Sequence, residues 1–204
     1  MILENLFPTP VAFFKLDRDL TKSEMDFIVD QPTRPNMGNT TSTNNFILRQ
    51  RKLTKLRDFI ENSISEYFDK TVNPKHQVSL RITQSWANYT EPGQWHHKHN
   101  HANSFISGVF YPRANKETDK ILFYRDGFSQ IKFPPKDWNN YNSESWWFPV
   151  GTGDLILFPS HLTHSVETVQ GEAQRISLSF NTFPVGLVGD EMDLTALRLE
   201  DHER

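Results

Sequence analysis

The sequence contains no cysteine among its 204 residues. This excludes a disulfide framework and every thiolate metal site, because both need sulfur, and it is compatible with a reducing compartment. An excess of charge of one sign is also missing, since 22 Lys and Arg against 25 Asp and Glu give a formal net charge of −3. A chain this close to neutrality has no electrostatic signature of nucleic-acid binding, and we expect no nucleic-acid partner.

Long apolar runs are missing as well. The most apolar runs, such as Val11–Phe14 and Leu155–Phe158, are far shorter than the roughly 20 residues that cross a bilayer. The first residues include Glu4 and Asn5 and do not show the charged and then apolar pattern of a signal peptide. We therefore expect a cytoplasmic protein with no membrane partner.

Large aromatic rings and histidines are what the sequence has in quantity. Aromatic residues make up 13% of the chain, including 16 Phe, while hydrophobic residues of all kinds reach only 36%. This combination predicts a modest core built from large rings. The length is typical of one domain. We expect residues 1–204 to form a single domain, with an N-terminal strand and helices at 1–77, a β core at 78–184 and a C-terminal tail at 185–204.

Two helices are predicted before residue 75. Thr21 and Glu24 have the spacing of a capping box, which predicts a short helix that ends near Val29. Apolar residues at helical spacing predict a longer helix from about Leu53 to Phe68, and Pro74 marks its end.

After residue 77 short runs rich in β-branched and aromatic residues alternate with turn sequences. Many short strands at close spacing favour a mostly β fold of the sandwich or jelly-roll type, here with N-terminal helices. Residues 34–46 are polar and rich in turn formers, which predicts a loop, and Leu194–Leu199 is predicted to be a tail or a short helix. Strands are expected near Val78–Tyr89, Ser104–Tyr111, Ile121–Arg125, Ser129–Phe133, Trp146–Val150, Leu155–Phe158, His164–Val169 and Ile176–Phe183.

A histidine cluster is the strongest chemical signal, because five of the eight histidines fall between positions 76 and 101. Side chains at i and i+2 of a strand point to the same face, so His97/His99 or His99/His101 could bind one metal ion. A third ligand must come from elsewhere, and His164 follows a buried-looking strand. The alternative is a surface cluster that binds metal adventitiously.

A carboxylate site is predicted shortly after His164. Arg175 and Ser177 share one face of the expected strand, and a cation with a hydroxyl donor suits a carboxylate ligand. The alternate positions Ile176, Leu178 and Phe180 form an apolar face. The alternative is an exposed surface arginine, which is the common situation of Arg in a strand.

The order His99-x-His101, His164 and Arg175-x-Ser177 resembles the iron(II)/2-oxoglutarate-dependent dioxygenase superfamily. Within it, the chain is similar to a little-characterised group of bacterial and viral oxygenases with a His-x-His motif. The resemblance covers about residues 84 to 183 and implies a double-stranded β-helix, that is, a cupin-like jelly roll. Further matching runs are Ser85–Tyr89, Ser107–Tyr111 and Gly153–Ser160.

The resemblance also implies a cofactor, a cosubstrate and residue roles. His99, His101 and His164 would hold Fe(II), and Arg175 with Ser177 would bind the C5 carboxylate of 2-oxoglutarate. The expected reaction is hydroxylation of a C–H bond, with release of succinate and carbon dioxide, in a small molecule or a peptide side chain. Other expected cosubstrate contacts are Tyr89, ten residues before His99, and also Tyr111 and Asn88.

One position departs from the wider superfamily. His101 stands where the second ligand is usually Asp or Glu, which leaves the native metal open. Alternatives are His97 as a ligand, a three-histidine cupin-type dioxygenase or zinc hydrolase, and a non-enzymatic jelly-roll binding module with a structural metal. The aromatic-rich segment from Gly127 to Val150 is either a substrate-recognising loop or a hairpin that covers the sheet. A homodimer also stays open.

Overall fold

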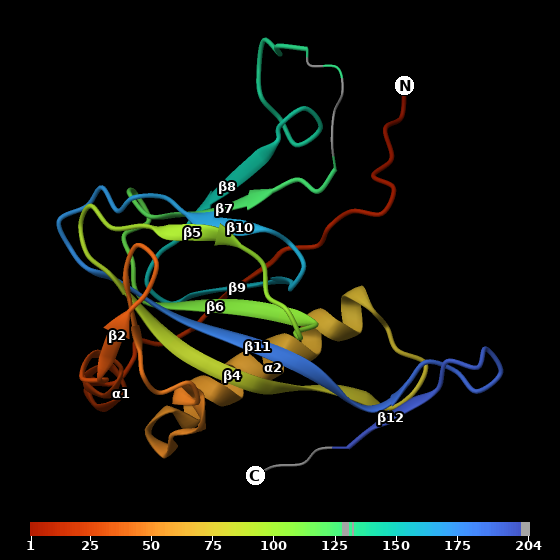
Figure 1. Cartoon of the computed structure of the whole chain (residues 1–204), viewed down its shortest axis with the longest axis horizontal. Helices are drawn as coiled ribbons and strands as arrows, with labels where there is room; N and C mark the ends of the chain where they lie inside the picture. The colour runs from red at the N-terminus through yellow and green to blue at the C-terminus, as the bar shows by residue number, and fades with distance from the viewer. Residues whose placement is uncertain (128–130, 132, 201–204) are drawn as a thin grey trace.

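The computed structural model describes residues 1–127, 131 and 133–200. Its strands form two sheets (Figure 1). The larger sheet has the order β1-β9-β6-β11-β4-β3-β2, with β12 paired to β11, and the smaller has the order β5-β10-β7-β8. The strands are β1 (Ala12–Lys15), β2 (Thr33–Pro35), β3 (Thr40–Ser42), β4 (Val78–Thr90), β5 (His96–His99), β6 (Ile106–Arg113), β7 (Lys120–Tyr124), β8 (Ser145–Pro149), β9 (Asp154–Pro159), β10 (His164–Val166), β11 (Arg175–Val188) and β12 (Leu197–Leu199).

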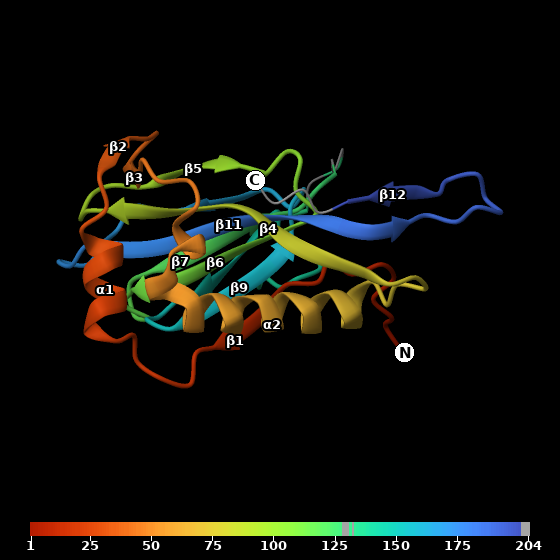
Figure 2. The ribbon, with the colours of Figure 1, turned by 90° about the horizontal axis from the view of Figure 1, so that it is seen from below.

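The long helix α2 (Thr54–Thr71) covers one face of the larger sheet (Figure 2). Its apolar stripe, which includes Leu56, Ile60 and Ile64, is buried against sheet residues such as Phe110. Helix stability in proteins comes mainly from this kind of packing, so the 3.6-residue repeat in the sequence was sufficient to predict α2. Two short 3₁₀ turns, η1 (Ile47–Arg49) and η2 (Arg51–Leu53), lead into the helix.

The other face of the larger sheet is opposite the smaller sheet. Strand β11 shows the division, because Ile176, Leu178 and Phe180 belong to the core on the helix side, whereas Arg175 and Ser177 alternate with them. A second apolar cluster lies on the other face and includes Val109, Ile121, Phe123, Ile156 and Phe158. Two antiparallel sheets around this cluster form the double-stranded β-helix.

Gly108 in β6 shows how tightly the larger sheet packs on its helix side. A Cβ atom on Gly108 would lie 2.2 Å from Cζ of Phe180 and 2.6 Å from Cδ2 of Leu157. No side chain fits at these distances, so the strand needs glycine here for steric reasons.

The short helix α1 (Lys22–Val29) begins with the predicted capping box. The Thr21 hydroxyl accepts from the Glu24 amide at 3.2 Å, and the Glu24 carboxylate accepts from the Thr21 amide at 2.7 Å. Arg18 donates two further hydrogen bonds to the same carboxylate, at 2.7 and 2.8 Å. Glu24 is therefore buried as a paired charge.

Three short segments differ from the local predictions or lie outside the described residues. The loop predicted at 34–46 contains the hairpin β2–β3, which extends the larger sheet because Thr41 pairs with Asn88. The helix predicted as one alternative for Leu194–Leu199 is wrong, since β12 pairs with β11 there. Short segments such as these gain their order from pairing with a neighbouring strand. The strand predicted at Ser129–Phe133 lies outside the described residues except for 131 and 133, which are not in a strand.

No helix in the described part of the chain is both long and apolar enough to cross a membrane.

Candidate metal and cosubstrate site

Strand pairing brings together histidines that are far apart in the sequence. His164 on β10 lies directly opposite His99 on β5 in the antiparallel register, and their ring centroids are 4.4 Å apart. His101 follows β5, where its amide donates to the Ser160 carbonyl at 2.9 Å. The ligand nitrogens of these three histidines all lie within 4.8 Å of one another.

Backbone carbonyls two residues earlier in the chain orient the imidazoles of His99 and His164. Nδ1 of His99 donates to the His97 carbonyl at 2.8 Å, and Nδ1 of His164 donates to the Leu162 carbonyl at 3.0 Å. A carbonyl can only accept, so Nδ1 carries the proton in both rings and Nε2 has a free lone pair. This arrangement fixes the tautomer that a metal ligand needs.

The spacing of the nitrogens suits one ion. Nε2 of His101 and Nε2 of His164 are 3.3 Å apart. Two nitrogens that bind one ion at about 2.1 Å and at right angles lie about 3 Å apart. The three-imidazole donor set therefore fits a divalent transition metal with cis coordination positions.

Burial keeps these imidazoles neutral. Burial, together with the smaller influence of the neighbouring His99, lowers the pKa of His164 to about 3 and that of His101 to about 4. Burial also lowers the pKa of His99, although its hydrogen bond to the His97 carbonyl opposes the shift. Neutral imidazole is the form that binds metal, so protons compete little with a metal ion near neutral pH.

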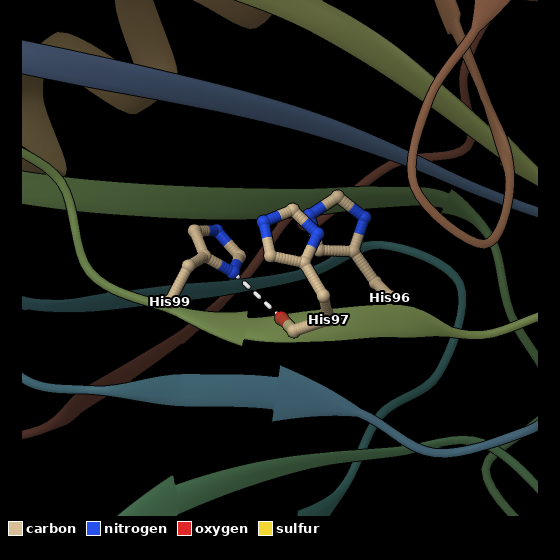
Figure 3. A group of neighbouring side chains, drawn as sticks. All are labelled: His96, His97 and His99. Carbon is tan, nitrogen blue, oxygen red and sulfur yellow. Dashed lines mark hydrogen bonds between the residues drawn. The ribbon is translucent and has the colours of Figure 1, made fainter.

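A β-bulge adds a fourth histidine to this region. His164 is opposite His99, but Val166 is opposite His96, so β5 has one residue more than β10 between these pairs. Bulges turn side chains away from simple alternation. The rings of His96, His97 and His99 consequently lie on one side of β5 (Figure 3), and their ligand nitrogens also lie within 4.8 Å of one another.

Arg175 is the buried cation of the site. It is only 3% exposed, so the alternative of a surface arginine is wrong. Its Nη1 atom lies 3.6 Å from Oδ1 of Asp119, a carboxylate that is itself buried. Burial lowers the pKa of Arg175, against the opposing influence of Tyr111 and Asp119. Tyr111 and Arg175 line the same narrow pocket as His99, His101 and His164.

Two further predicted residues line this pocket. Asn88 and Ser177 are direct partners in the β4–β11 pairing, and both face the space between the sheets. The Asn88 amide donates to Ser179 at 3.1 Å. Oδ1 of Asn88 is buried without a hydrogen-bond partner among the described residues, so it is available to a bound ligand.

The prediction for Tyr89 is wrong. Strand side chains alternate, and Asn88 faces the pocket, so Tyr89 points to the helix side. There its hydroxyl donates to the Ile28 carbonyl at 2.5 Å, and burial raises its pKa to about 12. The distance of ten residues from His99 gave no information about the face of the strand.

Some residues of the site had no recognisable signal in the sequence. Asn39 comes from the β2–β3 hairpin and Asp119 from the turn before β7, and neither belongs to a metal-binding or cosubstrate-binding motif. Trp86 and Thr90 line the pocket together with Asn88, at the alternate positions of β4. Trp86 and Thr90 could have been predicted, because strand residues two positions from Asn88 point to the same face.

The fold and these side chains place a cluster of three histidines that could hold a metal ion beside a buried arginine, between the sheets of a double-stranded β-helix. Residues 84–181 match a family model described as "Putative 2OG-Fe(II) oxygenase". This match covers just under half of the chain and includes His99, His101, His164 and Arg175. Over these residues the chain is similar to the Fe(II)/2-oxoglutarate-dependent oxygenases, which are oxidoreductases that use Fe(II) and 2-oxoglutarate. No match was found among curated proteins.

Solved structures share the fold at low identity. HygX from Streptomyces hygroscopicus, with nickel and 2-oxoglutarate bound, is 12% identical with a TM-score of 0.58, covering 96% of this chain and 93% of its own. A prolyl hydroxylase from Trichoplax adhaerens, in complex with a peptide fragment, is 11% identical with a TM-score of 0.54, covering 84% and 83%. A prolyl-4-hydroxylase from Pseudomonas putida is 11% identical with a TM-score of 0.52, covering 85% and 92%.

Proposed function

We propose that this protein is an Fe(II)/2-oxoglutarate-dependent oxygenase that hydroxylates a C–H bond of a small molecule or a peptide side chain. In this proposal His99, His101 and His164 hold Fe(II), and Arg175 binds the C5 carboxylate of 2-oxoglutarate. Ser177, Tyr111 and Asn88 complete the cosubstrate site.

One observation supports this proposal most directly: a buried arginine lines the same pocket as the three converging imidazoles. A zinc hydrolase or a structural metal site has no need of such a cation. A dicarboxylate that chelates the metal at one end needs a cationic partner at the other. The pocket is lined by imidazoles for one end of such a ligand and by Arg175 for the other.

The side chains act by positioning and by electrostatics. When bound, Fe(II) and 2-oxoglutarate supply the oxidation of a C–H bond, with release of succinate and carbon dioxide. Arg175 offers a forked pair of donors that fixes the direction of the carboxylate. Val109 and Phe158 give the pocket an apolar wall that excludes water and strengthens the pairing with Arg175.

The substrate is proposed to approach from a groove beside the pocket. This groove has a volume of about 460 Å³ and runs along β5 and β10. His96 and Val166 line both the groove and the inner pocket, so the two spaces adjoin at these residues.

The test is anaerobic. Fe(II) and then 2-oxoglutarate are added to metal-free protein, and the visible charge-transfer band of a chelated keto acid is recorded. The band is expected in the wild type and is expected to be absent from His164→Ala, which should also lose stoichiometric metal.

His161→Ala is the matched control, because His161 is exposed and lies three residues before His164. It should retain both the metal and the band. Retention of stoichiometric metal by His164→Ala would contradict the ligand set. Tight zinc and no band in the wild type would contradict the proposed reaction.

A further inference from the structure

His96 belongs to the inner pocket because of the bulge in β5. Regular alternation would place residues three apart on opposite faces, yet His96 and His99 both line the pocket, with ring centroids 4.8 Å apart. The pairs His164–His99 and Val166–His96 locate the extra residue between them. A bulge beside a site commonly turns one more side chain toward it.

The Asn39 side chain forms a hydrogen bond with the His96 ring. Its Nδ2 atom donates to Nδ1 of His96 at 3.1 Å and to the Thr90 hydroxyl at 3.2 Å. Because Nδ1 accepts, the proton of the neutral ring is on Nε2. His96 thus has the opposite tautomer from His99 and His164, and its free nitrogen is a donor rather than a metal ligand.

The hairpin that carries Asn39 is fixed in place by backbone contacts. The Gly38 carbonyl accepts from the Trp95 amide at 3.1 Å, next to His96. Gly38 has φ +88°, and a Cβ atom there would lie 2.6 Å from the Trp95 carbonyl oxygen. Glycine is needed for this close approach. Asn39 lies outside residues 84–181, so the family match does not include this contact.

We propose that His96, oriented by Asn39, donates a hydrogen bond from Nε2 to a carboxylate oxygen of 2-oxoglutarate. The inference rests on the proposed function and adds a residue to its cosubstrate site. His96 lines the same pocket as the three imidazoles and Arg175, which is the space that a dicarboxylate joining them would occupy. A neutral donor adds directional binding without another charge.

The first experiment measures binding of 2-oxoglutarate anaerobically by calorimetry, with Mn(II) in place of Fe(II), and metal content separately. His96→Phe should keep one metal per chain and bind 2-oxoglutarate about tenfold or more weakly, as expected for loss of one hydrogen bond to a charged group. His96→Gln, which keeps an N–H donor, should recover part of the affinity. Lys98→Ala is the control on the same strand, since Lys98 lies over the Tyr124 ring, and it should not change the affinity.

The second experiment detects the tautomer directly. Nitrogen-15 NMR of histidine-labelled, metal-free protein should show His96 protonated at Nε2 and unprotonated at Nδ1. Asn39→Asp replaces the donor with an acceptor, so the proton should move to Nδ1 and 2-oxoglutarate binding should weaken as in His96→Phe.

The outcomes separate the two proposals. If wild-type protein binds metal but no 2-oxoglutarate, the proposed function fails and the inference with it. If the wild type binds 2-oxoglutarate and His96→Phe binds it equally well, only the inference is overturned. Loss of metal from His96→Phe, in protein whose circular dichroism is unchanged, would identify His96 as a ligand and also overturn the inference.

Discussion

Arg175 is a buried cation that shares its pocket with the proposed metal ligands, and the carboxylate of Asp119 compensates only part of its charge at 3.6 Å. The Asp119 atom concerned, Oδ1, makes no hydrogen bond among the described residues. An arginine in this situation can accept a second anionic partner. This is the residue-scale reason to expect a dicarboxylate in the pocket.

Arg175→Lys is expected to weaken 2-oxoglutarate binding about tenfold or more and to leave metal content unchanged. Lysine keeps the charge beside Asp119 but loses the planar pair of donors. Calorimetric titration and metal analysis of the same sample measure the two effects. Loss of metal with unchanged 2-oxoglutarate affinity would contradict the role of Arg175.

The two tyrosines of the predicted site should behave differently. Tyr89→Phe leaves the buried Ile28 carbonyl without its donor, so the free energy of unfolding should fall by about 1–3 kcal/mol. Its affinity for 2-oxoglutarate should not change. Tyr111→Phe should weaken 2-oxoglutarate binding, because Tyr111 lines the pocket. Urea denaturation and calorimetry distinguish these effects, and a cosubstrate defect in Tyr89→Phe would contradict the assigned orientation.

At the scale of elements, the start of α1 depends on one buried carboxylate. Burial alone would raise the pKa of Glu24, but its hydrogen bonds with Arg18 and Thr21 outweigh burial and lower that pKa below its ordinary value. Its folded-state pKa therefore lies below its unfolded-state pKa. The stabilisation is complete above the unfolded-state pKa of about 4.5 and is lost as the pH falls through the folded-state value.

Glu24→Gln should reduce the free energy of unfolding by about 1–2 kcal/mol at pH 7. The difference from the wild type should shrink below pH 4.5, because the wild-type carboxyl group becomes protonated and loses the same interactions. Urea denaturation of both metal-free proteins, at pH 7 and at a pH below 4.5, measures this difference. The protonation of the histidines affects both proteins equally and cancels in the comparison. A difference that stays constant with pH would contradict the assignment.

Strand pairing determines which residues come together in the site. His99 and His164 are separated by 65 positions, yet they are direct partners across β5 and β10. The bulge in β5 adds His96 to the pocket, and the β2–β3 hairpin adds Asn39. The bulged strand β5 and the β2–β3 hairpin are both short, and the position of each depends on the strand with which it pairs.

For the whole molecule, metal binding should be coupled to stability, because the proposed ligands come from two distant parts of the chain, 99–101 and 164. Ligand at 100 times its dissociation constant stabilises the folded state by about 2.7 kcal/mol. Addition of Mn(II) to metal-free protein should therefore raise the midpoint of thermal unfolding by several degrees. Differential scanning calorimetry should show this shift in the wild type and in His161→Ala but not in His164→Ala. An equal shift in all three proteins would contradict the proposed centre.

Much of this protein was predictable from local sequence. The apolar repeat predicted α2, the Thr21–Glu24 spacing predicted the start of α1, and alternation placed Ile176, Leu178 and Phe180 on the apolar face of β11. These features depend on residues that are near one another in the chain, so the local sequence pattern is sufficient to predict them. The motif order in residues 84–183 also indicated the superfamily, because its spacing reflects a fixed strand topology.

Tertiary structure alone decided which side chains meet. Tyr89 fitted a spacing rule but faces the helices, whereas His96 violated alternation and faces the pocket because of a bulge. Asn39 lies in the turn of a hairpin that is positioned by pairing with β4, and Asp119 lies in a turn where its carbonyl accepts from the Val150 amide, so distant segments set both positions. Register, bulges and hairpin docking depend on packing between distant segments, and a local pattern in the sequence carries no record of that packing.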